Sequence, residues 1–231
     1  MTFLLDSFKS ALLLLWSLDK ELLNVISVSL KVSFSSTLIS SLAGIPLGLC
    51  IALNDFRGKR FLNTLLNTLL AMPTVVIGLL VYAFISRHGL LGDLGLLYTQ
   101  KAIIIGQVIL IVPIITTLTI AAISRIDDRY RKTAMTLGAT SFQAALVIFR
   151  EARFGILASI IVAFGRVIAE VGISMMLGGN ARGFTRTMTT AMALEYDKGE
   201  FVLSVALGLV LLMISFVLNI VFNRFQEMSE A

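Results

Sequence analysis

The chain has 231 residues, of which 57% are hydrophobic and 14% are charged. Soluble domains are only about 45–50% apolar, so this composition excludes an ordinary soluble protein and favours a membrane protein. The net charge of +5 is expected to set topology and to contact anionic headgroups, and the single Cys50 and His88 exclude an intrachain disulfide and a metal site rich in cysteine or histidine.

Residues 1–22 are predicted to form an N-terminal interfacial helix. The apolar part of this segment, residues 11–18, is much shorter than the ~20 residues that a membrane span needs. Trp16 suits the level of the lipid headgroups. If the segment spans instead, it adds a sixth span and moves the N-terminus to the cytoplasmic side.

Residues 23–225 are predicted to form one transmembrane domain, so the fold class is an all-α membrane protein. Apolar stretches of sufficient length predict five spans, near residues 25–53, 61–86, 102–123, 154–177 and 201–222. The second span is expected to break at Pro73, and the third contains Pro113. A proline inside a membrane helix frees a backbone carbonyl that neighbouring groups must satisfy.

The loop between the first two spans sets the sidedness. It holds Arg57, Lys59 and Arg60 within a few residues, which favours the cytoplasm. The loops at residues 87–101 and 178–200 then lie outside, and the C-terminus lies inside.

Residues 124–153, called here the coupling segment, form the longest polar interruption of the chain. Two short helices are predicted, with an aspartate at 127–128 capping the first and Gly138 ending it. Thr140 followed by Gln143 has the spacing of a capping box for the second helix. This helix–glycine–helix segment is too polar to span, and we expect it to dock a soluble partner on the cytoplasmic side.

A few polar side chains lie within the predicted spans. Arg166 and Glu170 have the i,i+4 spacing of one helix face, and an ionisable group at this depth costs at least ~2.5–3.5 kcal/mol unless it faces protein or water. They either line or gate a polar path or form a structural ion pair. Thr116 and Thr119, after Pro113, either offer hydroxyls to an oxyanion or pack helices together.

The sequence contains no nucleophile–base pattern, phosphate-binding loop or dinucleotide fingerprint. If the protein performs work, the energy must come from a partner chain or from an ion gradient.

The coupling segment resembles the cytoplasmic loop of ABC importer permeases. That loop typically reads Glu-Ala-Ala, three residues and Gly, with Ile-x-Leu-Pro further along the chain. Ala134, Gly138 and Ile148 match this pattern, whereas Lys132 stands in place of the glutamate and Arg150-Glu151 in place of Leu-Pro.

Further motifs resemble the molybdate, sulfate and tungstate branch of these permeases. They are Met72-Pro73-Thr74-Val75-Val76-Ile77-Gly78-Leu79, the run from Ala163 to Gly172, and Gly178-Gly179-Asn180. The motif Ala169-Glu170-Val171-Gly172 is most similar to that of the tungstate permeases, since the molybdate and sulfate permeases more often have Gly-Glu-Phe-Gly at this place.

The resemblance implies a type I importer permease in a prokaryotic plasma (inner) membrane. Two copies would form the pore, two cytoplasmic ATPase subunits would bind ATP and magnesium, and an extracytoplasmic binding protein would deliver a tetrahedral oxyanion. This chain would be no enzyme by itself and would hold no cofactor. The implied ATPase-coupling residues are Asp128, Arg131, Lys132, Ala134, Leu137, Gly138, Ala139 and Thr140. The implied residues of the translocation path or gate are Arg166, Glu170, Thr116 and Thr119.

Three alternatives stay open. The cargo could be molybdate or sulfate instead of tungstate. The chain could be a secondary transporter driven by protons or sodium, with Glu170 as the carrier, which would predict inverted repeats. It could also be a non-transporting scaffold whose coupling segment recruits a soluble protein.

Overall fold

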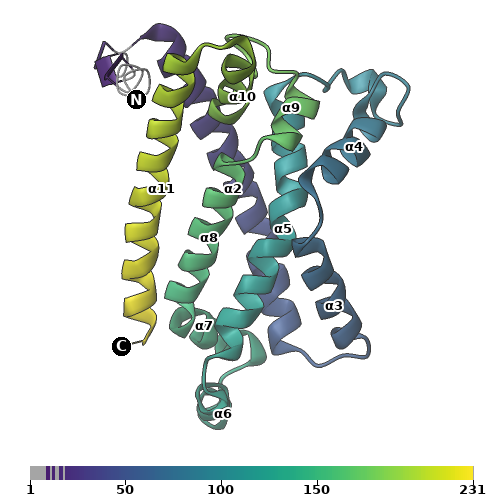
Figure 1. The fold of residues 1–231 in the computed structure, drawn as a ribbon. Coiled ribbons are helices and arrows are strands. Elements are labelled where there is room, and N and C mark those ends of the chain that lie inside the picture. Colours follow the sequence, from purple (N-terminus) through teal and green to yellow (C-terminus); the bar gives the residue numbers. More distant parts are fainter. Residues whose placement is uncertain (1–8, 11, 14–15, 18, 231) are drawn as a thin grey trace. The chain divides into compact units, whose positions relative to one another are not determined.

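The structure is a computed structural model that describes residues 9–10, 12–13, 16–17 and 19–230 (Figure 1). Most of the interfacial helix expected at residues 1–22 lies outside the described residues. In the part that is described, the regular secondary structure is helical throughout, from α2 to α11 with one short 3₁₀ turn, η1 (Gly92–Leu94). The all-α class predicted from composition is therefore confirmed.

Three helices are long and apolar enough to cross a membrane: α2 (Lys20–Leu53), α5 (Gln100–Ser124) and α11 (Phe201–Glu230). Two bent pairs raise the number to five if each pair counts as one span. The pairs are α3 (Lys59–Leu70) with α4 (Thr74–Ile85), and α8 (Arg153–Ile168) with α9 (Gly172–Gly178).

The break in the first pair falls at Pro73, as the sequence predicts. The break in the second pair lies within the span predicted at residues 154–177, and no residue of the sequence indicated it. The chain leaves the helix at residues 169–171, where buried side chains take over the hydrogen bonds of the backbone.

The remaining helices are short. They are α6 (Asp128–Thr136), α7 (Ser141–Glu151) and α10 (Met188–Lys198). The sequence predicted a polar external loop at residues 178–200, but α10 occupies half of it and its first turn is buried. The threonines in this region made it look like a loop, yet Thr187 and Thr190 form a capping box that starts the helix.

The chain divides into two compact units. Unit 1 contains Met1–Ser36, Pro73–Gln107 and Gly165–Val217, and unit 2 contains Thr37–Met72, Val108–Phe164 and Leu218–Ala231. The helices α2, α5, α8 and α11 therefore contribute residues to both units.

In unit 1, glycines let α4, α5 and α9 approach one another closely. A Cβ atom on Gly78 of α4 would lie 3.0 Å from Met176 Sδ, so this methionine serves packing. A Cβ atom on Gly106 of α5 would lie 2.6 Å from both Ile173 and Leu177. Small residues are the usual means by which membrane helices pack tightly, because lipid offers no hydrophobic driving force between them.

Unit 2 has its own apolar core and its own close helix contact. The buried members of the core come from α5, α7, the turn after it, and α8: Ile123, Ile148, Ala152 and Ile156. Gly48 of α2 lies against α5, where an added Cβ atom would be 2.7 Å from Thr119 Cβ and 2.9 Å from the Thr116 carbonyl oxygen. Real Cβ atoms do not approach other atoms so closely, so only glycine fits here.

We expect Gly48→Ala to destabilise the detergent-solubilised protein by about 1–3 kcal/mol, the usual cost of overpacking. Gly165→Ala in α8 is the matched control, because no atom lies within 4 Å of its would-be Cβ. Both variants gain the same helix propensity, so the difference in unfolding free energy, measured by titration with SDS in mixed micelles, reports the contact. Equal stabilities would contradict the assigned packing of α2 on α5.

Candidate functional site

The coupling segment has the helix–glycine–helix geometry that the sequence predicts. Asp127 caps α6, since its carboxylate accepts from the Arg129 backbone N–H at 2.9 Å. Gly138 has a φ of 86°, in the left-handed region. Thr140 Oγ1 accepts from the Gln143 N–H at 3.3 Å, and Gln143 Oε1 accepts from the Thr140 N–H at 2.8 Å, so the capping box is complete.

The turn between α6 and α7 is closed by the backbone itself. The Ala139 N–H donates to the Ala134 carbonyl oxygen at 3.0 Å, and the Gly138 N–H donates to the Met135 carbonyl oxygen at 3.1 Å. These two bonds, with Gly138 in the left-handed conformation, form a Schellman motif. Hydrogen bonds at both ends of the turn make α6 and α7 one stiff element.

The surface of the coupling segment combines charges with exposed apolar side chains. Lys132 Nζ lies 2.9 Å from Asp128 Oδ2, and this hydrogen bond lowers the pKa of Asp128 and raises that of Lys132, so both stay charged at neutral pH. Leu137 and Phe142 are 83% and 79% exposed. Large apolar groups uncovered on a polar segment are typical of a protein-binding surface.

A cavity of about 490 Å³ opens beside this surface, within unit 2. Leu49 and Leu53 from the end of α2 form one wall, and Phe142 and Leu146 of α7 form another, with Arg131 also lining the cavity. The coupling segment therefore offers a partner both a projecting apolar face and an adjacent hollow.

The second candidate site is the break between α8 and α9. Arg166 Nη1 lies 2.9 Å from Glu170 Oε2, so the two residues pair as predicted. Glu170 lies beyond the end of α8, however, and its other oxygen accepts from the Ile173 N–H of α9 at 3.2 Å. The Glu170 side chain is 3% exposed and that of Arg166 is 42% exposed, so one partner is buried and the other still meets solvent.

Side chains from two other helices satisfy the backbone at this break, and a third helix holds one of these side chains in place. Thr189 Oγ1 of α10 donates to the Glu170 carbonyl oxygen at 2.8 Å. Gln107 Nε2 of α5 donates to the Val167 carbonyl oxygen at 3.4 Å, while Gln107 Oε1 accepts from Ser36 Oγ of α2 at 2.7 Å. A broken membrane helix is tolerated only where its free backbone groups find such partners.

Ser36, Gln107 and Thr189 were not recognised as site residues from the sequence. One signal was available for Gln107, because an amide in the middle of an apolar span must find hydrogen-bond partners. Its partner carbonyl could not be identified, because the break in the fourth span was not predicted.

Thr116 and Thr119 lie in unit 2, whereas Arg166 and Glu170 lie in unit 1. Both threonines are buried. Thr116 Oγ1 donates to the Val112 carbonyl oxygen at 2.8 Å, and Thr119 lies against Gly48. Their burial is what helix packing requires, and a role in the path stays a prediction.

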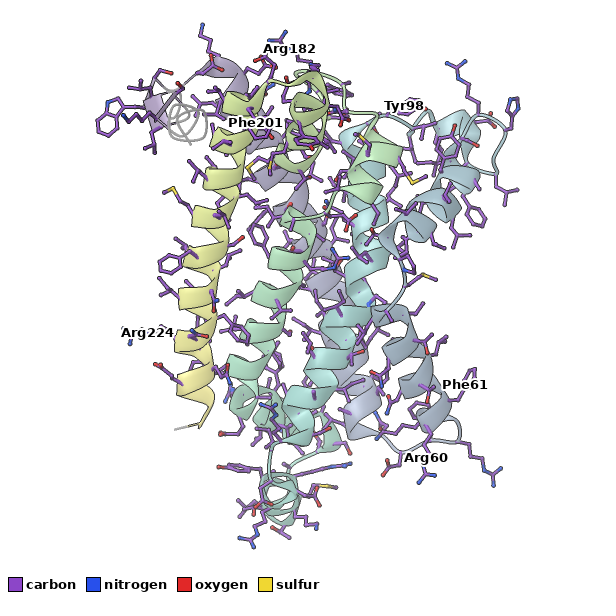
Figure 2. All side chains as sticks on the ribbon, viewed as in Figure 1. Arg60, Phe61, Tyr98, Arg182, Phe201 and Arg224 are labelled. Atoms are coloured by element: carbon purple, nitrogen blue, oxygen red, sulfur yellow. The ribbon has the colours of Figure 1, made fainter. Side chains whose placement is uncertain are left out.

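An ion-pair network in unit 1 links the start of α2 to α10. Glu21 pairs with Arg182, which is labelled in Figure 2, and with Arg186 at 3.3 Å. Glu195 of α10 lies 3.8 Å from Arg186 and 3.0 Å from Lys198. Among the residues that the structure describes, no three histidine, cysteine, aspartate or glutamate side chains gather as metal ligands.

The Arg166–Glu170 pair generates a prediction about stability. Arg166→Met should destabilise the protein by about 3 kcal/mol or more, because it leaves the buried Glu170 carboxylate unpaired. Adding Glu170→Gln should recover most of this loss, since glutamine carries no charge and still accepts from the Ile173 N–H. Unfolding by SDS of both variants and of Glu170→Gln alone measures the effect, and a double variant as unstable as Arg166→Met would contradict the assignment.

Comparisons with known proteins identify the family of the chain. Residues 44–231 match the family described as binding-protein-dependent transport system inner membrane component. A tungstate uptake system permease protein of Peptoclostridium acidaminophilum is 37% identical over 227 residues, covering 98% of this chain and 100% of the relative. Its counterpart in Campylobacter jejuni is 38% identical over 225 residues, covering 97% and 94%.

A solved structure supports the fold. The inward-facing MetNI methionine ABC transporter aligns with a TM-score of 0.74 at 15% identity, covering 94% of this chain and 97% of that one. With a family match over more than half its length, this chain belongs to the inner membrane components of binding-protein-dependent transport systems, the multi-pass permease subunits of ABC importers.

Proposed function

We propose that the chain forms the pore of an ATP-driven importer of tungstate. The observation that carries this proposal is the similarity, over nearly the whole chain, to two tungstate uptake permeases. The motif Ala169-Glu170-Val171-Gly172 at the helix break agrees with this proposal, because it resembles the motif of the tungstate permeases. Molybdate and sulfate have the same tetrahedral shape and charge, so cargo choice is part of the test.

The working complex contains two copies of this chain, two cytoplasmic ATPase subunits and an extracytoplasmic binding protein. ATP and magnesium bind the ATPase subunits. The coupling segment supports this assembly, because Leu137 and Phe142 are exposed at the turn between α6 and α7, and α6 also carries Arg131 and Lys132. ATPase closure then moves α6 and α7 as one body, and the binding energy of the partners selects between two states of the pore.

Arg166 and Glu170 are proposed to act at the gate of the path. A half-exposed guanidinium attracts an oxyanion, but the adjacent carboxylate cancels most of its field, so the pair is better suited to holding a gate than to binding cargo tightly. The helix break that the pair stabilises is a natural place for two discrete arrangements of α9.

Copurification tests the assembly and the cargo together. A tagged chain, purified from its own host, should retain an ATPase, and a tungstate-loaded binding protein should stimulate ATP hydrolysis several-fold in proteoliposomes. Stimulation by the molybdate- or sulfate-loaded protein alone would reassign the cargo. Uptake that needs a proton or sodium gradient and no ATPase would overturn the proposal in favour of a secondary transporter.

Gly138→Val should lower ATP-driven uptake at least tenfold while the protein still inserts, because a β-branched residue does not relax into the left-handed turn that joins α6 to α7. Gly199→Val is the matched control. Gly199 also has a left-handed φ, 82°, with no atom within 4 Å of its would-be Cβ, and it caps α10 instead of the coupling segment. Normal uptake by Gly138→Val, measured in proteoliposomes, would refute the coupling role of this turn.

A further inference from the structure

The helix α3 is divided lengthwise into a polar and an apolar half. Successive residues on a helix turn by about 100°, which places every polar side chain of α3 within one half of its circumference. The polar half holds Lys59, Arg60, Asn63, Thr64, Asn67 and Thr68. The apolar half holds Phe61, Leu62, Leu65, Leu66 and Leu69, while Leu70, the last residue of the helix, lies on the polar side between Lys59 and Asn63.

Packing covers only one part of this circumference. Leu62, Leu66 and Leu69 are half-buried. An exposed polar flank lies to one side of them, consisting of Arg60, Thr64, Asn67 and Thr68, and an exposed apolar flank lies to the other, consisting of Phe61 and Leu65. Figure 2 shows Arg60 and Phe61 at the start of α3, where the two flanks begin.

The two flanks require different surroundings in a membrane. With α4, α3 forms one of the apolar segments that can cross the bilayer. Phe61 and Leu65 suit lipid. Asn67 does not, because its amide has two donors and two acceptor sites that hydrocarbon cannot satisfy.

The threonines of the polar flank are partly satisfied by the helix. Thr64 Oγ1 donates to the Arg60 carbonyl oxygen at 2.9 Å, and Thr68 Oγ1 donates to the Thr64 carbonyl oxygen at 2.8 Å. The next polar position toward the packed side, Asn63, has a buried Oδ1 without a hydrogen-bond partner in the described structure. The amides of Asn63 and Asn67 therefore need water or another polar ligand beside the helix.

We propose that the polar flank of α3 lines the water-filled path along which the oxyanion crosses the membrane. Arg60 supplies positive charge at the start of α3, which raises the local concentration of anions. Further along, the amide of Asn67 replaces water around the oxyanion. The hydroxyls of Thr64 and Thr68 donate to it only when they turn away from the carbonyl oxygens of Arg60 and Thr64. Neutral donors bind weakly, which suits a path because cargo must leave as readily as it enters. This inference rests on the proposed function and extends it to residues outside the gate.

If α3 lay flat at the membrane surface, its polar flank would also face water. The test must therefore measure the depth of α3 in the bilayer. If α3 enters the bilayer, four residues of helix correspond to a change of about 6 Å in depth, at about 1.5 Å per residue. If α3 lies in the interface, all its residues have the same depth.

Single-cysteine variants test the proposal, because Cys50→Ser removes the only native thiol. Cysteines at Thr64 and Asn67 report the polar flank, and cysteines at Phe61 and Leu65 are controls at positions that the chain also leaves exposed. A negatively charged, membrane-impermeant methanethiosulfonate should label the polar flank at least ten times faster than the apolar flank in proteoliposomes that contain the whole complex. Equal rates on both flanks would overturn the proposal.

Two further measurements use the same variants. Fluorophores on Phe61→Cys and Leu65→Cys, quenched by lipids with nitroxides at two depths, should show Leu65→Cys about 6 Å deeper, and equal depths would overturn the proposal in favour of a surface helix. Modification at Thr64→Cys or Asn67→Cys should block tungstate uptake, and modification at Leu65→Cys should not. If uptake continues after full labelling of the polar flank, the proposal is overturned. If the complex takes up no tungstate even before modification, tungstate is refuted as the cargo, and the labelling pattern alone decides whether α3 lines the path.

Discussion

The buried carboxylate of Glu170 is the constraint on which unit 1 depends. It pairs with Arg166 and accepts from the Ile173 N–H, so it ends one helix and starts the next. A carboxylate with 3% exposure would be unstable without both partners. Because the break it holds also frees carbonyls, Gln107 and Thr189 must reach it from α5 and α10. The break that Glu170 holds is therefore where α5, α8, α9 and α10 are connected by hydrogen bonds.

The coupling segment follows a different logic, because its shape is encoded locally. An N-cap at Asp127, a left-handed Gly138 and a capping box at Thr140 and Gln143 are all contacts between residues close in sequence. These contacts fix the turn and the ends of its two helices locally, and Ile148 of α7 also anchors the segment in the core of unit 2. A locally fixed turn suits the coupling role proposed for this segment, because it can move as one body.

Two groups of polar side chains differ in their surroundings. Ser36, Gln107 and Thr189 are buried and paired, and they stabilise a break inside the protein. The polar flank of α3 is left exposed by its own chain, and we propose that it faces water. Bilayer physics makes this distinction meaningful, because a polar side chain at such depth either has a protein partner or faces an aqueous path.

The amino-acid sequence by itself determined the all-α membrane class, the break at Pro73 and the geometry of the coupling segment, because apolar run length, proline and capping residues act over a few neighbouring positions. It also paired Arg166 with Glu170 through their spacing. Only the tertiary structure decided that residues 169–171 are not helical and that Thr187 to Thr190 are buried, since both outcomes depend on contacts between residues far apart in the chain. The hydrogen bonds from Gln107 and Thr189 join residues far apart in the sequence and have no motif that predicts them. The site that they complete could therefore be recognised only from the tertiary structure.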